Sequence, residues 1–413
     1  MKRRIVLLAA LMAVAGGVMA QKKGFGYKFY GQVRTDLFYN SCSNSETVDG
    51  LFYMYPNDVA LDADGKDLNA KPDGNFYTLY TRLGLDVTGP MLGKVKTSAK
   101  VEVDFRGSGT TYSLFRIRHV YFNLDWGKSA LLVGQTWHPL YGDVAPEILN
   151  LNMGAPYQPF SRAPQVRYRF TQKNFMLTAA AVWQSQYLSV GPKSNEPGAT
   201  ATQKHQQFIK NSCVPEFYLG MDYKAQGIQA GAGIHLSSIT PRTQSEMNDG
   251  VYKVSERVTG LSGEAHVKYT HDKLMLAAKT VLSSNLTQTS TIGGYGITST
   301  DLRTGEQQYT PLRISHTWIS AMYGKKWRGG VFAGYLKNLG AKDEVTGILG
   351  TGTDIDQLAT ATAELTYNLP HWKFGAEYSW TGACYGENNA KGKVVDTHLV
   401  KNNRIVFTAL FQF

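Results

Sequence analysis

Two pairs of arginines suggest the chemistry that this chain could perform. Arg116 and Arg118 stand two residues apart, and so do Arg167 and Arg169. In a β-strand, residues two apart point to the same face, so each pair would present two guanidinium groups side by side. Positive charge concentrated on one wall attracts small anions. The spacing therefore predicts a basic wall that would favour anionic solutes.

The segment between the two pairs, Pro139–Arg162, is apolar for a connection between strands. It carries Leu140, Ile148 and Leu149 among prolines and aromatics, and such side chains gain little from exposure to water. We expect this segment to fold back into a lumen, where its acids could oppose the basic wall and create a transverse field in a constriction. The candidate constriction residues are Arg34, Arg82, Lys96, Lys100, Arg116, Arg118, Asp143, Glu147, Arg162, Arg167 and Arg169.

The elements that must position these side chains are β-strands. From Val95 to Phe105, apolar or small residues alternate with charged or polar ones, which is the period-two pattern of a strand. One lysine or arginine facing lipid at the middle of a bilayer costs about 2–4 kcal/mol. Dozens of alternating charges therefore cannot face lipid, and in a membrane barrel they must line a wet interior. The alternation alone would also fit a soluble β-sandwich with the two faces reversed.

Sixteen segments of this kind follow one another, joined by spacers that alternate between short and long, as at Gly127–Lys128 and Ser41–Gly74. The last long spacer is expected at Ala383–Val400. This rhythm predicts an all-β fold, a transmembrane antiparallel up-and-down β-barrel with 16 strands, short periplasmic turns, long extracellular loops and the third loop folded into the lumen. The register is weakly determined in 174–184, 311–324 and 327–337, which are apolar or glycine-rich on both faces. The strands are expected at 27–40, 76–88, 95–105, 113–126, 129–138, 164–171, 174–184, 215–224, 228–237, 257–270, 273–284, 311–324, 327–337, 355–369, 371–382 and 401–413.

The first twenty residues predict export. Met1–Ala20 begins with three basic residues, continues with an apolar run too short to span a membrane, and ends with a small-x-small cleavage site. We therefore expect a cleaved signal peptide at 1–20, a single barrel domain at 21–413 and a location in the bacterial outer membrane, in contact with its lipids. Of the formal charge of +11, three belong to this segment, which leaves +8. In an exported β-rich chain this excess argues for an anion-favouring lumen rather than for nucleic acid.

The last predicted strand and the cysteines bear on assembly. Apolar residues occupy every second position from Ile405 to Phe413, which resembles the C-terminal signal that the outer-membrane assembly machinery reads. Cys42, Cys213 and Cys384 lie in different predicted loops. An odd number cannot pair completely within one chain, so a Cys42–Cys213 disulfide and three free thiols both remain open.

At family level the chain resembles the trimeric sixteen-stranded bacterial outer-membrane porins. The stretch from Arg116-Ile117-Arg118-His119 through Gly134-Gln135-Thr136-Trp137 to Arg167-Tyr168 is similar to their DcaP-like and phosphate-selective branch. The resemblance covers the mature chain in architecture and about 115–170 in motif. It implies a homotrimer, a third loop folded inward and passive diffusion of small hydrophilic, often anionic, solutes. Acids interrupt the basic ladder in later strands, which argues against strict phosphate selectivity: Glu216, Asp222, Glu264, Glu364 and Glu377.

Three alternatives compete with an anion-favouring channel. The arginines could simply pair with carboxylates such as Glu102 and Asp104, without any solute preference. The barrel could be adhesive and bind partners through its long loops. It could also be an enzyme, but Ser113 and His119 would lie about 20 Å apart along a strand, and we find no other catalytic motif. The sequence predicts no cofactor or metal, since the acidic run beginning at Asp62 lacks the spacing of a calcium loop. The natural solute, pore radius, gating and oligomer contacts are not specified.

Overall fold

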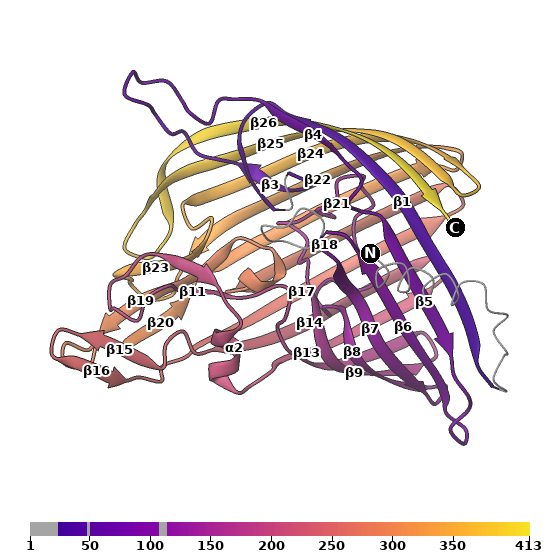
Figure 1. Cartoon of the computed structure of the whole chain (residues 1–413), viewed down its shortest axis with the longest axis horizontal. Helices are drawn as coiled ribbons and strands as arrows, with labels where there is room; N and C mark the ends of the chain where they lie inside the picture. Colours follow the sequence, from indigo (N-terminus) through magenta and orange to yellow (C-terminus); the bar gives the residue numbers. More distant parts are fainter. Residues whose placement is uncertain (1–23, 48–49, 107–113) are drawn as a thin grey trace, which may run out of the picture.

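The computed structural model describes residues 24–47, 50–106 and 114–413. In this part of the chain, sixteen antiparallel strands form a closed barrel (Figure 1), as the alternation and the spacer rhythm predicted. The predicted signal peptide at 1–20 lies outside the described residues. Among the described residues, no helix is long and apolar enough to cross a lipid bilayer.

Each barrel strand pairs with its neighbour in the chain, and the last pairs with the first. The closing seam runs from Gln32 opposite Gln412 to Asn40 opposite Arg404. The second strand is made of two pieces, β4 and β5, that both pair with β1. The strands are β1 (Gly26–Asn40), β4 (Asp73–Tyr77) with β5 (Arg82–Thr88), β6 (Lys96–Asp104), β7 (Arg116–Asp125), β8 (Ser129–Trp137), β9 (Arg162–Gln172), β10 (Phe175–Val182), β13 (Glu216–Ala225), β14 (Ile228–Ile239), β17 (Val258–His271), β18 (Leu274–Ser284), β21 (Arg313–Gly324), β22 (Trp327–Gly340), β24 (Ile355–Leu369), β25 (Trp372–Asn388) and β26 (Val394–Gln412).

The two faces of each strand differ in chemistry as an inverted, membrane-type barrel requires. On β6, Val101 is 42% exposed on the outer wall, whereas Asp104 is fully buried inside. On β26, Phe407 is 52% exposed and the inward Arg404 only 2%. Large apolar side chains cover the outside because hydrocarbon, not water, is the solvent that suits them.

Pairing settles the strands whose registers the sequence left weakly determined. Thr178 of β10 lies opposite Arg169 of β9, which places both inside. Trp318 of β21 lies opposite the inward Lys279 of β18, and both are buried. On β22 the small Gly334 lies directly opposite Trp318, and the indole packs beside Phe332 of the same strand, with the ring centroids 6.3 Å apart.

The long connections contain secondary structure of their own. The predicted long spacer at Ala383–Val400 is wrong, because β25 continues to Asn388 and β26 starts at Val394. The two strands stay paired as far as Asn388 opposite Val394, and Gly392, with φ of 64°, lies in the tight turn between them. The loop elements are β2 (Asn44–Thr47), β3 (Phe52–Pro56), β11 (Val190–Pro192), β12 (Thr202–Lys204), α2 (Gln207–Ser212), β15 (Gln244–Met247), β16 (Gly250–Lys253), η1 (Thr287–Thr289), β19 (Gly293–Thr300), β20 (Gln307–Pro311) and β23 (Gly347–Thr351).

The interior is not wet throughout. Val144 and Tyr157, both from the connection between β8 and β9, pack in one cluster with Trp318 and Phe332 of the barrel wall. All four side chains are at most 3% exposed. An apolar packing layer therefore covers the wall formed by β18 to β25, whereas ion pairs gather on the inner face of β1 and of β5 to β7.

Candidate functional site: the third loop and the arginine cluster

The third loop, residues 138–161, leaves the wall between β8 and β9 and crosses the lumen. Its ends are joined by a hydrogen bond from the His138 amide to the Ser161 carbonyl at 2.9 Å. The Lys279 ammonium on β18 donates to the carbonyls of Leu140 and Tyr141 at 3.0 and 2.9 Å. The Trp318 indole on β21 donates to Gln158 Oε1 at 2.8 Å. These partners face inward, so the third loop lies inside the barrel, as the sequence predicted.

The middle of the third loop is anchored between acids and an arginine. The Leu149 amide donates to Glu364 Oε2 at 2.9 Å and to Glu377 Oε2 at 2.6 Å. The Asn150 amide also donates to Glu377, at 3.1 Å. From β1, Arg34 Nη2 donates to the Leu149 carbonyl at 2.5 Å. The peptide group between Leu149 and Asn150 therefore has a hydrogen-bond partner at its carbonyl, Arg34, and one at its amide, Glu377. These bonds, with that to Glu364, fix the loop against β1, β24 and β25.

A single tyrosine lies at the centre of the basic wall. Tyr80 sits in the break between β4 and β5, where residues 78–81 leave the sheet. Four guanidinium groups lie over its ring, with Cζ-to-centroid distances of 4.9–5.4 Å. Contacts of this kind attract a cation to the negative face of the ring. Together with two neighbours, these four side chains form what we call the arginine cluster: Arg34, Arg82, Arg106, Arg116, Arg118 and Arg162.

Three carboxylates neutralise part of the arginine cluster. Asp36 binds Arg34 at 2.8 Å. Glu102 and Asp104 both bind Arg118, at 2.7 and 2.9 Å, and each contacts one further arginine of the cluster. Six guanidiniums against three carboxylates leave a surplus of positive charge. Among the described residues, no carboxylate forms an ion pair with Arg106 or Arg162.

The two arginines without a carboxylate are held by aromatic rings. Arg162 is fully buried, and its Cζ lies 4.6 Å from the ring centroid of Trp137 and 5.4 Å from that of Phe160. Its Nη2 donates to the Tyr187 hydroxyl at 3.1 Å, whereas Nε and Nη1 have no hydrogen-bond partner among the described residues. Arg106 lies over Phe52, and its Nε is likewise unpartnered. Buried donors without an acceptor favour an approaching anion.

Titration of two loop groups reflects the surplus charge. Burial alone would raise the pKa of the Tyr187 hydroxyl, but the charges of Arg162, Arg116 and Arg106 outweigh it, and the pKa is lowered. Burial lowers the pKa of Arg106 to about 10, with repulsion from Arg116 as the next cause. The shift of Tyr187 thus has the sign expected where positive charge exceeds negative charge, whereas that of Arg106 is mainly an effect of burial.

The remaining predicted site residues lie in three places. Lys100 binds Asp86 at 2.7 Å, and Arg169 binds Asp143 at 3.3 Å. Arg167 donates to Gln165 and to the Trp137 carbonyl, which supports the start of the third loop. Lys96 is exposed and lies opposite Asp125, near a short turn and outside the cluster.

Glu147 was expected to oppose the basic wall, but it points elsewhere. Its carboxylate binds Arg328 of β22 at 2.5 Å and lies 3.6 Å from Lys268 of β17. The third loop turns toward these later strands before it reaches β1, because its apolar side chains pack there. Glu147 therefore balances a second, smaller group of cations on the far wall.

One buried group has a donor set that suits zinc. His138, Glu216 and His235 place their ligand atoms within 4.8 Å of one another. However, the Leu140 amide donates to His138 Nδ1 at 3.1 Å, so Nε2 carries the ring proton of the neutral imidazole. That nitrogen then donates to Glu216 Oε2 at 3.2 Å and has no lone pair for a metal. The group fits a hydrogen-bond network that fixes the start of the third loop, not a metal centre.

A cavity of ≈ 570 Å³ adjoins the arginine cluster on the loop side of the barrel. Arg106 and Arg116 belong both to the cluster and to the lining of this cavity. Tyr187 and Lys204 line it as well, with Glu46 as its one acidic lining residue in the described chain. The charged part of this lining is therefore mainly basic, with Arg106, Arg116 and Lys204 against Glu46.

Sequence reasoning missed Tyr80, Arg106 and Tyr187. Arg106 continues the alternation of β6 two residues beyond Asp104, so its inward direction was a usable signal. Tyr80 and Tyr187 lie in segments without regular alternation. Their positions depend on how the break in the second strand and the loop after β10 fold, which no local pattern specifies.

The barrel is similar to several solved structures. The outer membrane channel DcaP of Acinetobacter baumannii matches with a TM-score of 0.67 at 18% identity, covering 95% of this chain and 98% of that chain. An in-vitro folded, trimer-form structure of the Vibrio cholerae outer membrane protein OmpT gives 0.56 at 12% identity, covering 94% and 100%. An anion-selective porin from Comamonas acidovorans gives 0.54 at 10% identity, also covering 94% and 100%. No protein-family model and no curated protein sequence matches the chain. The chain therefore adopts the sixteen-stranded porin fold.

Proposed function

We propose that the protein is an outer-membrane porin, a water-filled channel for passive diffusion of small hydrophilic solutes. The observation that carries the proposal is the inverted wall: apolar side chains face outward on all sides, and charged groups with the third loop lie inside. Sixteen strands enclose enough space for an aqueous path. The resemblance to solved porins and channels supports the same function.

The arginine cluster supports an anion preference. Its surplus charge lies beside the third loop and extends to the loop-side cavity through Arg106 and Arg116. A wall of one charge sign raises the local concentration of counter-ions, and thereby their flux. We propose that all eleven residues predicted from sequence act in the lumen, with those of the arginine cluster closest to the constriction. Tyr80, Arg106 and Tyr187 join them.

The assembly and location belong to the same proposal. We infer export by the segment at 1–20, a homotrimer, and recognition of the C-terminal strand ending at Phe413 by the assembly machinery. The trimer form of the Vibrio protein supports the second inference. A passive channel needs no catalytic group and no cofactor, and we assign neither.

Planar-bilayer recording of the purified protein tests the function. We expect step-like conductance and, in a salt gradient, a reversal potential of the sign given by anion preference. A clear cation preference would refute the assigned selectivity. Absence of conductance from a correctly folded barrel would favour an adhesive role, in which the loop elements bind a partner.

A further inference from the structure

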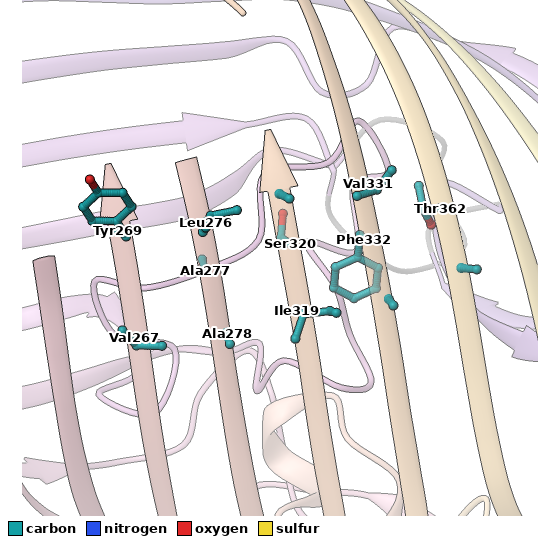
Figure 2. Close-up of a pocket in the computed structure, with 13 residues that line it drawn as sticks. Val267, Tyr269, Leu276, Ala277, Ala278, Ile319, Ser320, Val331, Phe332 and Thr362 are labelled. Carbon is teal, nitrogen blue, oxygen red and sulfur yellow. The ribbon is translucent and has the colours of Figure 1, made fainter. Parts of the chain in front are cut away.

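The outer wall of the barrel contains an apolar hollow of ≈ 620 Å³. It spans four neighbouring strands, β17, β18, β21 and β22, and reaches β24 (Figure 2). Its sides are formed by larger residues such as Val267, Leu276 and Ile319. The hollow lies between them because the outward side chains there are only alanine methyl groups: Ala278, Ala321, Ala333 and Ala361.

The rim below the hollow is aromatic and basic. Outward Tyr323 and Trp327 are 64% and 62% exposed at the short-turn ends of β21 and β22, as expected for an interfacial girdle. The turns below carry three exposed lysines, Lys273, Lys325 and Lys326, against one aspartate, Asp272. Asp272 forms an ion pair with Lys325, with 2.6 Å between Oδ1 and Nζ. This aspartate therefore does not balance the charges of Lys273 and Lys326, which lie directly under the apolar hollow.

The vertical spacing matches that of a lipid. Ala321 precedes Lys325 by four residues, which is about 13 Å along a strand. A strand tilt of about 40° reduces this to about 10 Å across the membrane. The hydrocarbon half-thickness is about 15 Å, so an acyl chain whose phosphate lies at the turns would pass over the hollow.

We propose that this face binds a glycerophospholipid with an anionic headgroup, from the leaflet on the side of the short turns. One acyl chain fills the hollow, and Lys273 and Lys326 contact the phosphate and headgroup. The proposal rests on the assignment of the barrel to a membrane, which is part of the proposed function. It differs from that function because it concerns the outer wall and not the lumen.

Native mass spectrometry after reconstitution tests the site. The probes are dioleoylphosphatidylglycerol and dioleoylphosphatidylcholine, offered separately to the full-length protein. We expect preferential retention of the anionic lipid. Ala278→Leu with Ala321→Leu, which fills the hollow, should reduce that retention at least tenfold. The matched control is Ala99→Leu with Ala179→Leu, two outward alanines on β6 and β10 that do not line the hollow.

The lysines are tested separately from the hollow. Lys273→Gln with Lys326→Gln should remove the headgroup preference, since each lysine near an anionic lipid contributes roughly fivefold in affinity. The control is Lys94→Gln with Lys173→Gln, which changes two exposed lysines in other short turns. Equal retention of both lipids, unaffected by either variant, would overturn the proposal.

Two further outcomes have distinct meanings. If filling the hollow dissociates an oligomer into monomers, the face is a contact between copies and the lipid proposal is wrong. Conductance is recorded on the same samples and should be unchanged in every variant. Specific lipid retention without conductance would contradict the porin proposal and leave the lipid site standing.

Discussion

Arg34 on the first barrel strand donates to the Leu149 carbonyl at 2.5 Å, although 115 residues separate them in the chain. The bond joins the middle of the third loop to the wall that closes the barrel. Arg34 also binds Asp36 and lies over Tyr80. The same side chain thus links the loop anchor to the arginine cluster, so the position of the third loop and the charge of the wall are coupled.

Removing Glu377 should release the third loop. In Glu377→Ala, the buried Asn150 amide loses its acceptor and the Leu149 amide keeps only Glu364, and a buried donor left unsatisfied costs about 1–3 kcal/mol. We expect a loss of about 2 kcal/mol or more in urea unfolding and larger current fluctuations. Glu377→Gln should recover most of the loss, because its amide oxygen still accepts. Glu387→Ala, at an exposed position on β25, is the control. Equal effects of the two alanine variants would argue against a loop anchor.

Uncompensated arginines should set the selectivity. Arg106→Gln removes a charge that no carboxylate balances among the described residues, whereas Arg116→Gln with Asp104→Asn removes a bound pair. One charge about 10 Å from the path contributes about 0.4 kcal/mol through water, or about twofold in anion preference. We expect that loss for Arg106→Gln and little change for the double variant, both measured by reversal potential. Arg162→Gln should act like Arg106→Gln. If the double variant had the larger effect, paired arginines would be the selective ones.

A positive charge should destabilise the barrel at an outward position of a strand and be tolerated at an inward position of the same strand. Val101 and Ser98 both lie on β6, the first on the outer wall and the second facing the lumen. Val101→Arg should cost about 2–4 kcal/mol because it places a cation in lipid. Ser98→Arg should be tolerated within about 0.5 kcal/mol. Urea titration in lipid vesicles measures both, and a reversed order would contradict the inverted barrel.

Anion preference should decrease in alkaline solution through Tyr187. The pKa of this hydroxyl is lowered by Arg162, Arg116 and Arg106 against the opposing effect of burial. As the pH rises through this value, a negative charge forms inside the arginine cluster and cancels one guanidinium. The ionised form also stabilises the fold above pH about 10, where unfolded tyrosine ionises, and this gain is lost as the pH falls through the lowered pKa.

Reversal potentials between pH 7 and about pH 10 check this dependence. Tyr187→Phe should weaken this dependence. Tyr252→Phe, at a loop tyrosine that contacts Asp249 and Arg303 instead, should retain the decrease. A wild-type preference that is constant over this range would show that Tyr187 does not ionise near the ion path.

The sequence alone determined the barrel and the direction of its faces. Period-two alternation specifies which side chain shares a face with which, so Arg116 with Arg118 and the inward face of β6 could be predicted from spacing. The cost of charge in lipid then decides which face is inside, without any knowledge of the strand partners. The last two strands extend beyond the predicted 371–382 and 401–413, because the residues between these ranges pair as well, as far as Asn388 opposite Val394.

Only the tertiary structure decided which charges meet. The register between β6 and β7 sets Arg118 between Glu102 and Asp104, and the fold of the third loop sends Glu147 to Arg328 and away from the basic wall. The ring of Tyr80 enters the arginine cluster through a break that alternation does not encode. These contacts join residues 14 to 181 positions apart, and a local pattern carries no information on partners so distant. Charge balance in the lumen is therefore a property of the closed barrel.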